Sequence, residues 1–172
     1  IAKNTPPGKF RKSYAFMNWK DYDQELFELI KEEAEARDFI HHIYASDINA
    51  SNIITTRTNA RNARVFNLIE FATADFAKLD REFANGLIMM NPPYGERMQI
   101  KEPEALYEMI GERLKHQYTG NTAWILSSSL NYIHKIGLKP TAKIRLYNGA
   151  LECSFQKYEL FEGKRKLLIR KN

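Results

Sequence analysis

The sequence predicts an α/β fold in which helices cover a mostly parallel, doubly wound sheet. Two observations carry this prediction. Amphipathic helical patterns alternate with short apolar strands between residues 21 and 126. The chain then closes with two strand-like runs joined by Asn148-Gly149, a dipeptide that strongly favours a tight antiparallel hairpin. The 172 residues fit a single domain, expected over residues 1–172, with a substantial core.

The first twenty residues are expected to be irregular, because prolines and a glycine interrupt them. Basic and aromatic residues alternate there, so Lys9, Arg11 and Lys12 could bind the phosphates of an RNA. The alternative is a structural loop that its aromatic side chains fix to the domain. A helix is predicted next, over residues 21–37, because apolar side chains recur at steps of three and four.

Two of the predicted strands are followed by an aspartate. The strand over residues 41–46 ends at Asp47, which precedes a helix, and the strand over residues 67–73 is followed by Asp75 and Phe76. An acid at such a strand end can accept hydrogen bonds from ribose hydroxyls. Asp47 could equally cap the helix that it precedes, and Asp75 could be an ordinary turn residue.

The chain is organised around the stretch that follows the apolar strand over residues 86–90. Asn91 precedes a proline, which holds it in extended geometry beyond the strand end. Pro92 and Pro93 stiffen the loop. The loop therefore offers an amide, free carbonyls and the ring of Tyr94, groups that suit a planar, hydrogen-bonding substrate such as a nucleobase.

The remaining elements follow from the same patterns. They are predicted as a helix over residues 47–63, a helix over 103–118, a strand over 122–126, a short helix over 131–136, hairpin strands over 143–147 and 151–161, and a basic tail over 163–172. The single cysteine, Cys153, lies in a strand-like run and is expected to be buried.

Composition restricts the class of protein. The net charge of +5 permits a polyanionic partner such as RNA. The apolar runs are far shorter than the roughly 20 residues of a membrane span, so no membrane association is expected. His41 and His42 have no suitably spaced partner, so no metal site is expected. One cysteine allows no internal disulfide, which is compatible with the cytoplasm.

The tetrad Asn91-Pro92-Pro93-Tyr94 resembles the signature of amino-group methyltransferases that use S-adenosylmethionine. The longer stretch from Asn91 to Arg97 resembles ribosomal RNA guanine-N2 methyltransferases whose full chains carry an N-terminal THUMP domain. The similarity extends from Pro7 to about Tyr158. It implies a Rossmann-like class I methyltransferase sheet, mostly parallel with a C-terminal antiparallel hairpin.

The resemblance implies methylation of an exocyclic base amine, foremost guanine N2 in 23S ribosomal RNA, by a cytoplasmic enzyme. Asn91 and the Pro92 carbonyl would accept the hydrogens of the amine, and Tyr94 would stack on the base. Arg97 would hold a phosphate of the RNA, or brace the loop by pairing with an acid.

The same resemblance implies S-adenosylmethionine as the cofactor. Asp47, with Ile48 beside it, would bind the ribose of the cofactor. Asp75 would accept from the adenine amino group, while apolar neighbours such as Phe76 enclose the ring.

A glycine-rich turn after the first strand is missing from this pattern. The eight glycines stand at least nine positions apart, so the sequence contains no G-x-G turn. In the resembling family the first strand and its turn lie just before a segment like residues 1–8, and the THUMP portion lies further upstream. We therefore expect a C-terminal part of a longer protein, which alone is inactive and binds S-adenosylmethionine weakly or not at all. The absent strand would sit between the strands that end at Asp47 and Met90.

Other functions share these motifs. Adenine-N6 methyltransferases of DNA or RNA, and glutamine-N5 methyltransferases of proteins, carry the same tetrad. Gly95-Glu96-Arg97 and the Asn148-Gly149 hairpin favour the RNA guanine family. A non-catalytic RNA-binding module is the alternative from another class, and the presence of Asp47, Asp75 and Asn91 together argues against it.

Overall fold

The computed structural model describes residues 3–5, 11–33, 37–81, 83, 85–93 and 102–162. The chain divides into an N-terminal unit, Ile1–Phe76, and a C-terminal unit, Ala77–Asn172. The expectation of a single domain over residues 1–172 stays a prediction. Among the described helices, none is long and apolar enough to cross a bilayer.

The N-terminal unit begins with a 3₁₀ turn, η2 (Ala15–Asn18), and helix α1 (Gln24–Glu33). The turn is a small departure from the irregular lead-in that the sequence predicts. Phe16 packs against Tyr14 and Phe27 with ring centroids 5.2 and 5.7 Å apart, so aromatic contacts tie the lead-in to α1. The Asp23 carboxylate accepts from the backbone N–H of Leu26 at 2.9 Å, which satisfies a free donor of the first helical turn.

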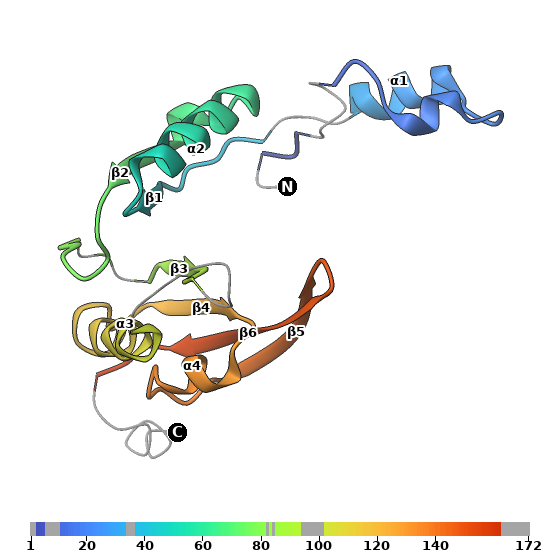
Figure 1. Cartoon of the computed structure of the whole chain (residues 1–172). Coiled ribbons are helices and arrows are strands. Elements are labelled where there is room, and N and C mark those ends of the chain that lie inside the picture. Colours follow the sequence, from blue (N-terminus) through green and yellow to red (C-terminus); the bar gives the residue numbers. More distant parts are fainter. Residues whose placement is uncertain are drawn as a thin grey trace, which may run out of the picture. The chain divides into compact units, whose positions relative to one another are not determined.

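Two parallel strands and a helix form the rest of this unit (Figure 1). Strand β1 (Ile43–Asp47) pairs with β2 (Ile69–Thr73) in a register that sets Ile43 opposite Ile69 and Asp47 opposite Thr73. Helix α2 (Ala50–Asn62) connects them and packs on both strands, with Ile53 and Ala60 buried. A short 3₁₀ turn, η3 (Phe66–Leu68), leads into β2.

The C-terminal unit holds a four-stranded sheet. Strands β3 (Leu87–Met90), β4 (Thr122–Ser127), β5 (Ala142–Asn148) and β6 (Leu151–Glu159) lie in the order β3-β4-β6-β5. β3 and β4 are parallel, whereas β6 runs antiparallel to both of its neighbours. Gly149 has a φ of +64° in the β5–β6 turn, a conformation that glycine adopts without strain. The predicted hairpin is therefore confirmed.

Helices α3 (Pro103–Gln117) and α4 (Leu130–His134) cover one face of this sheet (Figure 1). Successive side chains of β4 point to opposite faces, and the covered face holds Ala123, Ile125 and Ser127, all fully buried. The Tyr107 hydroxyl of α3 lies 2.9 Å from the Ser127 hydroxyl, so a buried hydrogen bond ties helix to strand.

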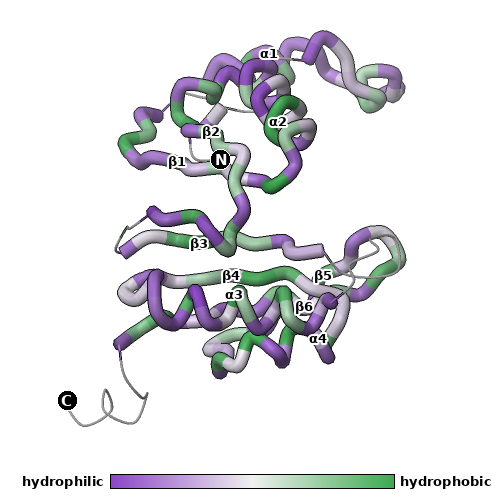
Figure 2. Tube along the Cα trace, turned by 60° about the vertical axis from the view of Figure 1, so that its left-hand side comes forward, coloured by the Kyte–Doolittle hydropathy of each residue, from purple (hydrophilic) through white to green (hydrophobic). Residues whose placement is uncertain are grey.

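The opposite face of the same sheet is apolar and largely open in the described residues. Trp124 stacks on Phe155 with ring centroids 4.6 Å apart, and both are half-buried. On β3, Leu87 and Met89 are 59% and 68% exposed. Figure 2 shows β3 in the green of apolar residues.

The α/β fold class is confirmed, with parallel pairs β1–β2 and β3–β4 and the antiparallel C-terminal hairpin. Cys153 is buried, as predicted. Among the described residues, β1 has β2 as its only neighbour and β3 has β4. The predicted basic tail lies outside the described residues.

Candidate functional site

Asp47 lies at the carboxyl end of β1, where local hydrogen bonds orient its carboxylate. Oδ1 accepts from the backbone N–H of Asn49 at 2.7 Å, and Oδ2 accepts from the side-chain amide of Asn52 at 3.0 Å. Asn49, not Asp47, is the N-cap of α2, because its side chain accepts from the backbone N–H of Ser51 at 2.9 Å. The capping role that the sequence left open for Asp47 therefore belongs to Asn49.

Asp75 follows the neighbouring strand, next to Asp47. The backbone N–H of Ala74 donates to the Asp47 carbonyl at 3.0 Å, which extends the parallel pairing beyond the ends of β1 and β2. Asp75 and Phe76 are half-buried, and Ile48 is 71% exposed. The structure thus brings the predicted cofactor residues together at one edge of the two-stranded sheet.

The chemistry of these residues fits a nucleoside. Among the described residues, each oxygen of Asp47 has one protein donor and keeps acceptor capacity for a hydroxyl, since a carboxylate oxygen has two lone pairs. A second carboxylate at Asp75 and the apolar side chains of Ile48 and Phe76 supply an acceptor and surfaces for a flat ring. Carboxyl ends of parallel strands are where open α/β sheets bind ligands.

Asn91 and Pro92 follow β3 in the C-terminal unit. Met90, the last residue of β3, lies opposite Ile125 in the parallel pairing with β4. Asn91 is exposed beyond this point, whereas Pro92 is buried and Pro93 half-buried. The two prolines fix the backbone on which the Asn91 amide projects. Tyr94 and Arg97 lie outside the described residues.

A buried asparagine that the sequence reasoning missed fixes the start of β3. The Asn121 side-chain amide donates to the carbonyls of Phe83 at 2.6 Å and Tyr118 at 3.0 Å, and its Oδ1 accepts from the backbone N–H of Gly86 at 2.8 Å. These contacts span up to 38 positions along the chain. The only local signal was an asparagine after Gly120 in the turn before β4.

The predicted RNA-binding residues of the lead-in are only partly described. Arg11 and Lys12 are exposed, and the Arg11 guanidinium lies 5.4 Å from the centre of the Tyr14 ring. Lys9 lies outside the described residues. His41 and His42 lie against the rings of Phe39 and Tyr44, and the described residues contain no cluster of three or more metal-ligating side chains.

Comparison with known sequences identifies the family. Residues 1–157 match the RMKL-like methyltransferase domain. The chain belongs to this family. It is 34% identical over 167 residues to the ribosomal RNA large subunit methyltransferase K/L of Shewanella amazonensis, an alignment that covers 93% of this chain and 24% of that protein. The RMKL-like chain thus spans about a quarter of the length of the curated relatives it matches.

Solved structures show the same fold. The protein SMU.472, in complex with S-adenosylhomocysteine, is similar with a TM-score of 0.81 and 26% identity, over 94% of this chain and 44% of that chain. A protein from Listeria monocytogenes named as an N6-adenine-specific DNA methylase is similar with a TM-score of 0.77 and 27% identity, over 92% of this chain and 41% of that chain. The RMKL-like chain has the fold of class I S-adenosylmethionine-dependent methyltransferases.

Proposed function

We propose that the full-length RMKL-like protein methylates the exocyclic N2 amine of a guanine in 23S ribosomal RNA, in the cytoplasm, with S-adenosylmethionine as cofactor. The observation that carries this proposal is the exposed Asn91 on a proline-stiffened strand end in a chain of this family. The related ribosomal RNA large subunit methyltransferases support the class of substrate.

Asn91 and Pro92 position the amine. Its lone pair is delocalised into the base, which makes it a weak nucleophile. The Asn91 Oδ1 and the Pro92 carbonyl accept its two N–H groups, so the lone pair is drawn out of conjugation and aimed in one direction. This is catalysis by orientation and by electrostatic stabilisation, and acceptors on a stiff loop suit it because their spacing is fixed.

The N-terminal unit supplies the groups for the cofactor. Bound S-adenosylmethionine provides an electrophilic methyl group on a sulfonium. Asp47 accepts from the ribose hydroxyls, with Asn49 and Asn52 holding its carboxylate in place. Asp75 accepts from the adenine amino group, and Ile48 and Phe76 contact the ring.

Substrate RNA requires contacts to its phosphates and to the withdrawn base. Tyr94 stacks on the base after it leaves its helix, which enzymes acting on bases require. Arg97 and the basic residues Lys9, Arg11 and Lys12 pair with phosphates. The exposure of Arg11 and Lys12 supports this assignment.

Mass spectrometry of 23S ribosomal RNA tests the proposal. RNA from a strain that lacks the gene is expected to lose one or more N2-methylguanine residues. The full-length wild-type gene restores them, whereas the Asn91→Ala gene, expressed to the same level on an immunoblot, does not. An unchanged set of N2-methylguanines in the deletion strain would contradict the proposed substrate, and restoration by Asn91→Ala would contradict the role of Asn91.

Adenine N6 is a second candidate target, because a protein similar to this chain carries that specificity in its name. The amine chemistry at Asn91 and Pro92 is the same for both bases. Loss of N6-methyladenine from DNA or RNA of the deletion strain, with N2-methylguanine intact, would favour this candidate.

A further inference from the structure

Two arginines on α2 are stacked against aromatic rings of the N-terminal unit. The Arg57 guanidinium lies 5.6 Å from the centre of the Phe71 ring, and that of Arg61 lies 4.4 Å from the centre of the Phe66 ring. The two rings are themselves stacked, with centroids 5.5 Å apart and planes 24° from parallel. The four side chains therefore form a ladder in the order Arg57, Phe71, Phe66 and Arg61.

This stacking immobilises the arginines while leaving most of their donors free. A guanidinium contacts a ring through its flat face, whereas its five N–H groups point outward in its own plane. Arg57 uses one of them on the Phe71 carbonyl, at 3.4 Å. Both arginine side chains are exposed, so their N–H groups are accessible to a planar or tetrahedral anion. The ring contacts hold the guanidinium groups in place before such an anion binds.

Helix α2 contains no aspartate or glutamate. Glu70 precedes Phe71 on β2, and successive strand side chains point to opposite faces, so its carboxylate is directed away from the ladder. Among the residues that the structure describes, neither Arg57 nor Arg61 forms an ion pair, which favours an anionic partner over a purely structural role.

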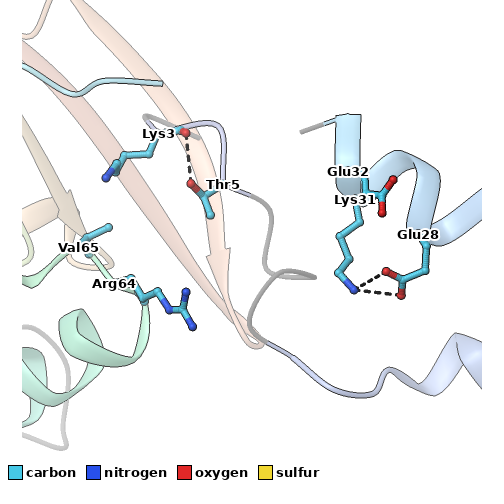
Figure 3. A pocket seen from close by; sticks show the side chains of 8 residues that line it. Lys3, Thr5, Glu28, Lys31, Glu32, Arg64 and Val65 are labelled. Carbon is cyan, nitrogen blue, oxygen red and sulfur yellow. Dashed lines mark hydrogen bonds and ion pairs between the residues drawn. The ribbon is translucent and has the colours of Figure 1, made fainter. Parts of the chain in front are cut away.

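A hollow of the same unit holds further basic side chains. It has a volume of about 550 Å³, and Arg64, Lys3 and Lys31 lie around it (Figure 3). Lys31 is paired with Glu28 at 2.7 Å, and Glu32 also lines the hollow, so acidic and basic side chains face it together. Arg57 and Arg61 stand four positions apart on α2, a spacing that keeps them on one side of that helix, whereas Arg64 lies beyond the end of α2.

We propose that Arg57 and Arg61 bind backbone phosphates of the substrate RNA. This rests on the proposed function for the identity of the RNA. Contacts of this kind fix the position of the RNA and carry no base specificity. The ladder is distinct from the residues that we assign to the cofactor and to the amine.

Salt-dependent binding to a fluorescently labelled RNA hairpin of random sequence tests the proposal with the full-length protein. The double substitution Arg57→Gln/Arg61→Gln is expected to weaken binding about tenfold and to reduce the slope of log affinity against log salt by about 1 for each arginine. The pair Lys139→Gln/Lys143→Gln, which removes the same charge from exposed positions of the C-terminal unit, should leave the slope unchanged. An unchanged slope in a folded Arg57→Gln/Arg61→Gln variant would overturn the proposal.

Chemical protection of the wild-type protein provides a test that no folding defect can affect. Phenylglyoxal should modify Arg57 and Arg61 more slowly when the RNA hairpin is present, as measured by peptide mass spectrometry. Equal modification rates with and without RNA would also overturn the proposal. Neither the salt dependence of RNA binding nor the phenylglyoxal protection depends on methyl transfer. Both can therefore be interpreted even if the protein does not methylate RNA.

Discussion

Asn121 fixes the backbone that leads into β3 and thereby the strand end that presents Asn91. Its amide donates to three carbonyls and accepts from Gly86, and the side chain is 3% exposed. In the Asn121→Asp variant a carboxylate replaces the amide, and it has no N–H group to donate to those three carbonyls. We expect a loss of about 3 kcal/mol or more in the free energy of unfolding, since buried polar groups lose their partners and a charge is added.

Urea unfolding of the 172-residue chain measures this loss. Asn67→Asp makes the same chemical change at an exposed position and should alter stability by less than about 0.5 kcal/mol. If both variants unfold at the same urea concentration, Asn121 does not anchor β3.

Tyr158 makes the stability of the C-terminal unit depend on alkaline pH. Burial, and secondarily the proximity of Tyr107, raises the pKa of the Tyr158 hydroxyl well above its ordinary value. The folded pKa therefore exceeds the unfolded value of about 10, so the contribution of the neutral phenol is complete below about pH 10 and is lost as the pH rises further. We expect the free energy of unfolding to fall above about pH 10.

The variant Tyr158→Phe isolates this effect. It loses the hydrogen bond to Gln156 Oε1 and about 1 kcal/mol at neutral pH, but its stability should fall less steeply above about pH 10. Tyr147→Phe, at a 64% exposed position, should keep the wild-type dependence. Identical alkaline slopes in wild type and Tyr158→Phe, measured by urea unfolding across this range, would argue against burial as the cause.

At the scale of elements, α3 and the segment after α4 approach so closely that only glycine fits between them. A Cβ on Gly111 would lie 2.0 Å from the Ile136 carbonyl oxygen, a backbone atom that cannot rotate away. Gly111→Ala is therefore expected to lower the free energy of unfolding by about 3 kcal/mol, at the upper end of the range for overpacked sites.

A second glycine provides the control for this substitution. Gly149 has no neighbour within 4 Å of an added Cβ, and its φ of +64° is the only obstacle to alanine. Gly149→Ala should cost about 1 to 2 kcal/mol from backbone strain alone. A smaller loss for Gly111→Ala than for Gly149→Ala, in chemical denaturation, would mean that α3 and α4 separate easily.

The order and type of the elements could be predicted from sequence because each carries a local signal. The apolar period of three to four residues in α3 and the Asn148-Gly149 turn are examples, and both predictions are confirmed. The N-cap of α2 was harder to assign, since Asp47 and Asn49 are both good caps and only the bond to Ser51 distinguishes them. The Asn121 contacts join positions far apart in the chain, which no local pattern reveals.

The roles assigned to the candidate site residues stay predictions, and only their places in the fold can be compared with the sequence. The grouping of Asp47 and Asp75 followed from strand ends, because parallel neighbours present their carboxyl ends at one edge. The role of Asn52 in holding Asp47 had no signal, because many polar residues occupy the first turns of helices. The ladder of Arg57 and Arg61 includes the rings of Phe66 and Phe71, which follow α2 in the sequence and lie against its arginines in the folded chain. No local sequence pattern predicts these contacts.

For the molecule as a whole, the described residues form two sheets whose strands end in groups of different chemistry. Carboxylates follow β1 and β2 in one unit, and a proline-held amide follows β3 in the other. On the four-stranded sheet, Leu87 and Met89 are exposed in the part of the chain that the structure describes. The matched region is about a quarter of the length of the curated relatives.

In the proposed function, Asp47 binds the cofactor and Asn91 positions the amine, so the two groups of residues have separate tasks. Titration calorimetry with S-adenosylmethionine, combined with radioactive methyl transfer to 23S ribosomal RNA, tests this separation most directly in the full-length protein. Asp47→Ala should lose at least tenfold in cofactor affinity, whereas Asn91→Ala should bind the cofactor as wild type does and transfer no methyl group. Wild-type transfer by Asn91→Ala, or wild-type cofactor affinity in Asp47→Ala, would contradict the account.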